Sequence, residues 1–214
     1  MKNSSQLLPT YVSLYVQGRG AFRQELAKYV KQGPTGKGNI EEMIVISERP
    51  AETGDQAVPG HWECDLLYGT RTTAIGTLVE RRTRFVMLFK LRFGINAESA
   101  RIGLTQKILT LPEFLGRSLI DRHSRLEVVG PEPFTIDDRI RVYFCDPAHP
   151  WLPGANESTN GLLRQYFPKD KTVAKYTQEQ LDFVAAQLNG RPRETLGWKN
   201  PAETLTQALN SARV

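Results

Sequence analysis

The pattern of hydrophobic and polar positions predicts β-strands in the middle of the chain. Apolar Trp62, Cys64 and Leu66 alternate with mostly polar neighbours, which is the two-residue period of a strand that is buried on one face. Residues 74–80 predict a second strand, and the nearly all-apolar run 85–91 predicts a third strand that is covered on both faces. Because the connections between the three are short, we expect an antiparallel meander.

Helices are predicted where apolar residues recur three and four positions apart. Residues 96–109 show this spacing behind an Asn that can cap the helix, and residues 178–188 and 201–209 show it again. Two further short strands are predicted at 119–121 and 141–145. Three strands, a helix, two strands and then helices predict an α/β fold with a mixed five-stranded sheet, which is compatible with a ribonuclease-H-like core.

Another helix is predicted just after the Pro- and Gly-containing loop 150–154, with Asn156 as its N-cap. At about 100° per residue, Glu157 shares one face of this helix with Asn160 and Arg164. The opposite face carries Leu162, Leu163, Tyr166 and Phe167. We therefore expect the apolar face to pack on the sheet while the polar face presents an acid, an amide and a guanidinium.

The first part of the chain, residues 1–46, is predicted to be a small N-terminal extension. It contains one amphipathic helix that ends near Gly33 and a basic, Gly-rich linker over 32–38. Its apolar content is too low for a core of its own. Residues 47–214 are therefore expected to form the main domain.

The chain of 214 residues has a formal net charge of +5, and a basic balance favours an anionic partner such as nucleic acid over a merely solvated surface. Cys64 and Cys145 lie far apart in strand-like runs, so we expect buried thiols in a cytoplasmic protein and neither a disulfide framework nor a zinc site.

Trp151 and Trp198 are expected to be packing anchors and not surfaces for stacking on bases. Hydrogen-bonding roles, in preference to metal ligation, are expected of His61, His123 and His149.

Three acids occupy positions from which they can converge at one edge of the sheet. Asp65 lies on the first predicted strand, Asp121 ends the fourth, and Glu157 opens a helix. Carboxylates held close together repel one another, and a divalent cation with a preference for oxygen ligands relieves that repulsion. One or two Mg²⁺ or Mn²⁺ ions would suit such a site. The alternative is that each acid is an ordinary surface charge.

Four neighbours of these acids are candidate supporting residues. Glu63 lies on the same strand face as Asp65 and could act as an auxiliary acid or pair with an arginine. We favour the structural interpretation, in which it pairs with an arginine. Asn160 shares the face of Glu157. Arg164 could bind DNA or orient Glu157. Lys169 could contact a phosphate or simply be solvated.

Long runs of the chain resemble, in the same order, the catalytic region of the insertion-sequence-thirty family of bacterial DDE transposases. The matching runs include Trp-Glu-x-Asp at 62–65 and Asn-Glu-x-x-Asn-Gly at 156–161. The full set is 46–52, 58–66, 78–88, 142–147, 150–151, 156–169, 188–193 and 196–203.

The resemblance implies an RNase-H-like integrase core that uses Mg²⁺ or Mn²⁺ to cleave and transfer DNA strands during transposition. Asp65, Asp121 and Glu157 match the family's catalytic triad, Asp121 through a Leu-x-Asp-Arg context. DNA is the implied partner, and a homo-oligomer or pairing with a full-length transposase is a further expectation. A nuclease of the same fold with another substrate is a more distant reading.

The chain also departs from the family pattern. Cys64 stands where Gly is usual, Pro153 where Arg is usual and Ser158 where Asn is usual, and the stretch 120–139 has few family-like residues. The family normally begins with a helix-turn-helix region that has no counterpart before Tyr11. The alternative function is therefore an inactive, truncated transposase that binds DNA or a transposase partner.

Overall fold

The computed structural model describes residues 58–70, 72–112, 115–116, 118–121, 135–136, 140–144 and 155–211. For Asp121 it describes the backbone only. The predicted extension 1–46 lies outside the described residues, and so do Cys145, Trp151, His123 and His149. Within the described part, no helix is long and apolar enough to cross a membrane.

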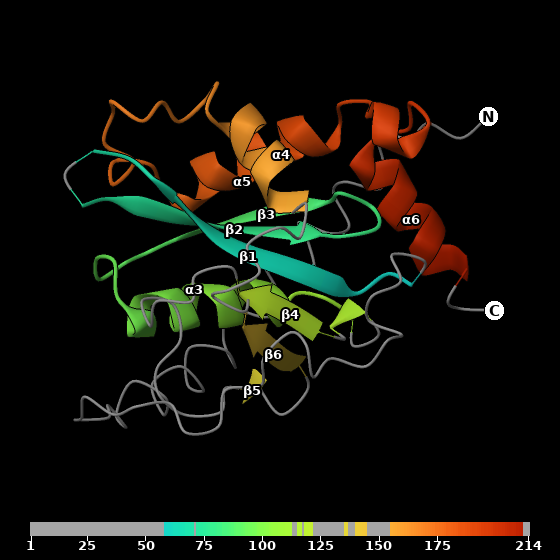
Figure 1. Ribbon diagram of the computed structural model, residues 1–214, viewed down its shortest axis with the longest axis horizontal. Coiled ribbons are helices and arrows are strands. Elements are labelled where there is room, and N and C mark those ends of the chain that lie inside the picture. The colour runs from blue at the N-terminus through green and yellow to red at the C-terminus, as the bar shows by residue number, and fades with distance from the viewer. Residues whose placement is uncertain are drawn as a thin grey trace. The chain divides into compact units, whose positions relative to one another are not determined.

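One mixed sheet organises the described part of the chain, with the strand order β3-β2-β1-β4-β6-β5 (Figure 1). The strands β1 to β3 form the predicted antiparallel meander, β4 lies parallel to β1, β6 lies parallel to β4, and β5 is antiparallel to β6. Their bounds are β1 (His61–Tyr68), β2 (Ala74–Glu80), β3 (Val86–Lys90), β4 (Ser118–Asp121), β5 (Thr135–Ile136) and β6 (Ile140–Phe144). The five predicted strands are all present. A sixth strand, the two-residue β5, lies at the edge of the sheet. It was not predicted, because a strand so short leaves no periodic signal in the sequence.

The helices begin where the sequence supplies caps. The Asn96 side chain accepts a hydrogen bond from the Ser99 amide, and Thr177 and Gln180 form a reciprocal capping box. The helices are α3 (Ala97–Ile108), α4 (Ala155–Leu163), α5 (Gln178–Asn189) and α6 (Pro201–Ser211), with a short 3₁₀ turn η5 (Glu194–Leu196) before α6. The predicted helices at 96–109, 178–188 and 201–209 are therefore confirmed.

Helix α3 covers one face of the sheet (Figure 1). Its buried Ala100, Leu104 and Ile108 pack against Trp62 and the other inward residues of β1. The indole of Trp62 is fully buried and donates a 2.7 Å hydrogen bond to the Leu115 carbonyl. The alternation read from β1 thus sends Trp62, Cys64 and Leu66 into the core beneath α3.

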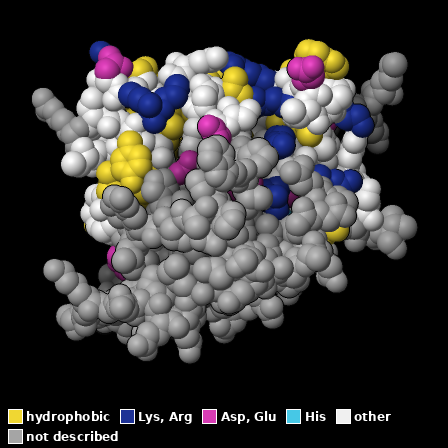
Figure 2. All heavy atoms as spheres, in the orientation of Figure 1, with side chains coloured by type: hydrophobic (Ala, Val, Ile, Leu, Met, Phe, Trp, Pro, Cys, Tyr) yellow, Lys and Arg dark blue, Asp and Glu magenta, His cyan; other side chains and the backbone are white. Residues whose placement is uncertain are grey.

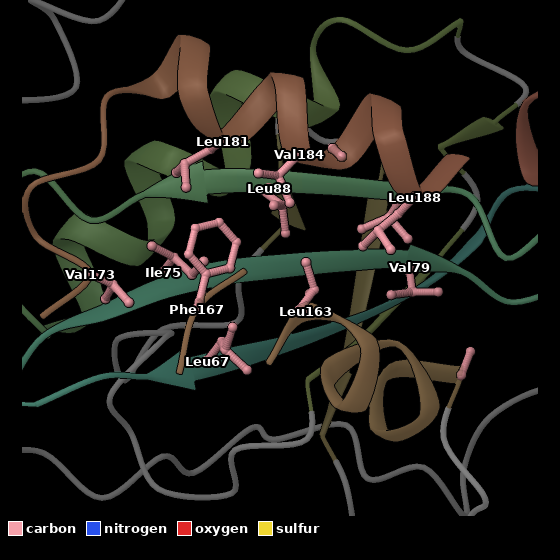
Figure 3. Close-up of a cluster of buried hydrophobic side chains, with 13 residues drawn as sticks. Leu67, Ile75, Val79, Leu88, Leu163, Phe167, Val173, Leu181, Val184 and Leu188 are labelled. Atoms are coloured by element: carbon pink, nitrogen blue, oxygen red, sulfur yellow. The ribbon is translucent and has the colours of Figure 1, made fainter. Parts of the chain in front are cut away.

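Helices α4 and α5 cover the opposite face, and Figure 3 shows the second hydrophobic cluster between them and the sheet. Leu67 of β1, with Ile75 and Val79 of β2, meets side chains from the helical layer. That layer contributes Leu163, Phe167, Val173, Leu181, Val184 and Leu188. Since side chains alternate between faces along a strand, Glu63 and Asp65 lie on the same face of β1 as Leu67, beneath α4.

Candidate active site

Asp65 lies within β1, and its carboxylate is held by two hydrogen bonds. The Leu66 amide donates to Oδ1 at 2.8 Å, and the Asn160 amide nitrogen Nδ2 donates to Oδ2 at 2.8 Å. The second bond joins residues 95 positions apart and connects β1 to α4. Each carboxylate oxygen keeps acceptor capacity for a further ligand, because an ionised carboxyl group has about four lone-pair sites.

Two asparagines of α4 place polar atoms beside this strand. The Thr77 hydroxyl of β2 lies 3.1 Å from the Asp65 carbonyl oxygen and 3.1 Å from Oδ1 of the fully buried Asn156. Among the described residues, Asn156 Nδ2 and Asn160 Oδ1 are buried without a hydrogen-bond partner. Buried polar atoms are nearly always paired, so these two atoms indicate that the region around Asp65 is built to receive a polar group.

Glu63 supports the start of α4. Its Oε2 accepts a 3.1 Å hydrogen bond from the Asn156 backbone amide, and its Oε1 lies 3.3 Å from Nε of Arg81. The ion pair with an arginine was the favoured prediction for Glu63, and it is confirmed. The predicted N-cap role of Asn156 is wrong, because α4 already begins at Ala155. The Glu63 carboxylate accepts a hydrogen bond from this first-turn amide, which has no partner within the helix, and a negative charge at this end also stabilises the helix dipole.

Arg164 lies at the other end of α4 with its guanidinium turned back to the backbone. It donates to the Tyr68 carbonyl at 2.7 Å and to the Phe167 carbonyl at 3.3 Å. Burial lowers the pKa of the guanidinium, and the nearby negative charge of Asp65 partly offsets this effect. Arg164 therefore contributes a fixed positive charge near Asp65 while it joins α4 to the end of β1.

The other two acids of the predicted triad are placed less completely. Glu157 is exposed on the first turn of α4, three residues before Asn160. The backbone of Asp121 is the last residue of β4 and pairs with Cys64, the chain neighbour of Asp65. The side chain of Asp121 lies outside the described residues, and among the described ones no three His, Cys, Asp or Glu side chains are grouped to hold a metal ion.

The donor set nevertheless suits a hard divalent cation. Asp65 offers carboxylate oxygens, and Asn160 Oδ1 is a buried amide oxygen next to it that has no partner among the described residues. Mg²⁺ and Mn²⁺ prefer carboxylate and carbonyl oxygens. The described atoms therefore fit the predicted kind of ion.

The remaining predicted residues differ in their burial and their contacts. Cys64 is buried, as predicted, and His61 Nδ1 shares a 2.7 Å hydrogen bond with Ser118 Oγ, which confirms its hydrogen-bonding role. Lys169 is exposed. The prediction that Trp198 is a packing anchor is wrong, because 72% of this residue is exposed. The tight turn after η5 gives Trp198 a φ of 65° and directs it away from the core.

Sequence reasoning missed two residues that support the site. Thr77 contacts both Asp65 and Asn156, and Arg81 pairs with Glu63. A polar residue within the otherwise apolar strand 74–79 was an available signal for Thr77. For Arg81 there was none, because three arginines occur within 81–84 and the sequence does not indicate which one turns inward.

Comparisons with known proteins give relatives over most of the chain, although no protein-family model matches it. The transposase InsI for insertion sequence element IS30C of Escherichia coli K12 is 44% identical over 183 residues, which cover 85% of this chain and 47% of that protein. The transposase for element IS1086 of Cupriavidus metallidurans is 40% identical over 210 residues, covering 93% of this chain and 61% of that protein. The chain thus spans about half the length of InsI.

A solved structure supports the fold. The catalytic core domain of BIV integrase superposes with a TM-score of 0.51 at 17% identity, covering 72% of this chain and 99% of that domain. The predicted RNase-H-like integrase fold is therefore confirmed. Over most of its length, the chain resembles the transposases of the insertion-sequence-thirty family and has the fold of an integrase catalytic core.

Proposed function

We propose that this chain carries the DNA-cleaving and strand-transferring activity of a transposase, with Asp65, Asp121 and Glu157 as its three acids. The observation that carries the proposal is the hydrogen bond from Asn160 to Asp65. Residues three apart on a helix are neighbours on one face, so a helix that anchors Asn160 to Asp65 also brings Glu157 towards that strand. The relatives that are transposases support the same reading.

The three acids would hold one or two Mg²⁺ or Mn²⁺ ions, with Asn160 Oδ1 beside them. When bound there, such an ion would supply Lewis-acid chemistry for the attacking and leaving oxygens of a phosphodiester. The chain's own residues supply the positioning. Asn160 fixes the rotamer of the Asp65 carboxylate, and Arg164 offsets part of its negative charge. Glu63, held by Arg81, fixes the beginning of α4.

The proposal is tested by incubating the full 214-residue chain with labelled DNA that carries the ends of the insertion element and with Mn²⁺. We expect cleavage by the wild-type chain and a loss of about 10³-fold or more for Asp65→Asn and Glu157→Gln, since removing one member of an acting group removes most of the catalysis. Asp170→Asn is the matched control, because Asp170 is exposed and pairs only with the exposed Lys171. Equal products from Asp65→Asn and wild type would refute the proposal.

A further inference from the structure

A cluster of arginines lies away from Asp65, at the turn between β2 and β3 and in the segment that follows α5. Arg84 belongs to the turn, while Arg191 and Arg193 follow α5. The three are close enough that the positive charges of Arg191 and Arg84, after burial, lower the pKa of Arg193. We call these three residues and Trp198 the Arg–Trp surface. Figure 2 shows basic side chains gathered over the C-terminal helices on this side of the molecule.

The scaffold holds the two segments of the Arg–Trp surface together. Asn189, the last residue of α5, is buried and accepts from the Val86 amide at 2.8 Å while it donates to the Val86 carbonyl at 2.8 Å. These two hydrogen bonds satisfy the Val86 amide and carbonyl at the start of β3, as a neighbouring strand would do. Arg84 precedes Val86 by two residues and Arg191 follows Asn189 by two, so their proximity is fixed by the fold.

Within the part of the chain that the structure describes, no acid forms an ion pair with the arginines of this surface. Arg191 donates to Gln165 and to the Tyr166 hydroxyl and lies over the Tyr166 ring, all of which are uncharged. Nε and Nη2 of Arg193 are buried and have no hydrogen-bond partner among the described residues. Leaving guanidinium donors unpaired beside two like charges costs free energy. A phosphate group would relieve that cost, because its oxygens match the guanidinium fork.

Trp198 adds an aromatic side chain to the same surface. Its amide donates to the Arg193 carbonyl at 2.9 Å, and the Arg193 amide donates to the Lys199 carbonyl at 3.0 Å, so the two side chains are presented by one tight loop. Trp198 and Arg84 both adopt left-handed backbone conformations, with φ of 65° and 58°. Such conformations are unfavourable for large side chains and cluster at functional sites.

We propose that the Arg–Trp surface binds a DNA strand, with the arginines on a phosphate and Trp198 stacked on an unpaired base. This inference rests on the proposed function for its choice of DNA as the polymer. Bases stack on exposed aromatic side chains beside basic grooves in many proteins that bind single strands. The register supports the choice, since Thr77 of β2 is the partner of Asp65 and β2 ends three residues later at Glu80, just before the turn that carries Arg84. At about 3.4 Å per residue, the start of that turn lies roughly 10 Å along β2 from Asp65, within reach of the same bound strand.

The test measures DNA binding without metal in the full chain carrying Asp65→Asn, so that cleavage plays no part. The probe is a labelled single strand long enough for a site of about 4–16 nucleotides. We expect Arg84→Gln with Arg193→Gln to weaken binding about tenfold or more at low salt and to reduce the slope of log affinity against log salt by about one per lost contact. Trp198→Ala should weaken binding about fivefold or more, whereas Trp198→Phe should retain most of the affinity.

Arg92→Gln is the matched control, because Arg92 is an exposed arginine just beyond the other end of β3. It should change the affinity little. Wild-type affinity in the folded Arg84/Arg193 double variant, or an equal loss for Arg92→Gln, would overturn the inference. So would inorganic phosphate that raises the melting temperature of the wild-type chain while the variants bind DNA normally, because the surface would then take free phosphate only. A chain that binds through this surface and does not cut DNA would refute the proposed function alone.

Discussion

Asn160 is the residue on which the geometry of the site depends most. Its Nδ2 donates a 2.8 Å hydrogen bond to Asp65 Oδ2, and its Oδ1 is a buried amide oxygen. Without it the Asp65 carboxylate would keep its bond to the Leu66 amide but lose this hydrogen bond to α4. We therefore propose that Asn160 is a positioning residue, which affects catalysis by orienting the Asp65 carboxylate.

We predict that Asn160→Ala lowers the rate of DNA cleavage about 10- to 100-fold, which is the usual effect of removing a partner that orients a metal ligand. The melting temperature should change little, because Asn160 is only partly buried. Single-turnover cleavage checks the rate, and Asn210→Ala on the exposed end of α6 is the control. A variant as fast as wild type would show that Asp65 needs no orientation from α4.

At the same scale, the sequence predicted Asp65 and Glu157 through the resemblance carried by their flanking motifs, but it could not predict the contacts that hold them. Glu63 meets Asn156 across 93 positions of sequence, and Thr77 meets Asn156 across 79. Such pairs depend on the packing of α4 over β1, which a single sequence does not encode as a local pattern. For the same reason the sequence predicts Asn156 as the N-cap of its own helix, whereas in the structure Glu63 of β1 accepts a hydrogen bond from the first turn of that helix.

The elements follow the sequence closely where a period could be read. The five strands and the helices α3, α5 and α6 were predicted from apolar patterns, such as the alternation in β1, the continuous apolar run of β3 and the three- and four-residue spacing in the helices. The exposed Trp198 was not, since a large aromatic residue in a loop is usually buried and no periodicity marks its direction. Close packing between neighbouring strands also requires a small residue at one position of β2, which is Gly76.

Gly76 in the middle of β2 leaves room for the Phe89 ring on the neighbouring strand β3. A Cβ at this position would overlap the ring, so we predict that Gly76→Ala destabilises the fold by about 1–3 kcal/mol, the usual cost of overpacking a core. Gly161→Ala in α4 is the control, because no atom lies within 4 Å of its added Cβ, and it should be neutral or stabilising by up to about 1 kcal/mol. Denaturant unfolding followed by circular dichroism measures both, and a Gly76→Ala chain as stable as wild type would contradict this account of the β2–β3 contact.

At the scale of the whole molecule, the proposed catalytic site and the proposed DNA-binding surface lie at different places on the sheet. The α4 face of β1 carries the acid Asp65 with its supporting residues, and Arg84 of the β2–β3 turn lies close to Arg191 and Arg193 of the segment after α5. A net charge of +5 over the chain favours a polyanion near both regions. The order of strands brings the backbone of Asp121, at the end of β4, beside the chain neighbour of Asp65, as the positions of these acids on two predicted strands suggested.

The most direct test of the central claim is calorimetric titration of the full chain with Mn²⁺, comparing wild type with Asp65→Asn and Asp121→Asn. If the acids share a metal site, wild type should bind saturably and each variant should lose most of that binding, because carboxylate ligands supply the charge that holds the ion. Asp170→Asn should bind as wild type does, since Asp170 is a surface acid. Equal Mn²⁺ binding by wild type and both site variants would contradict the account.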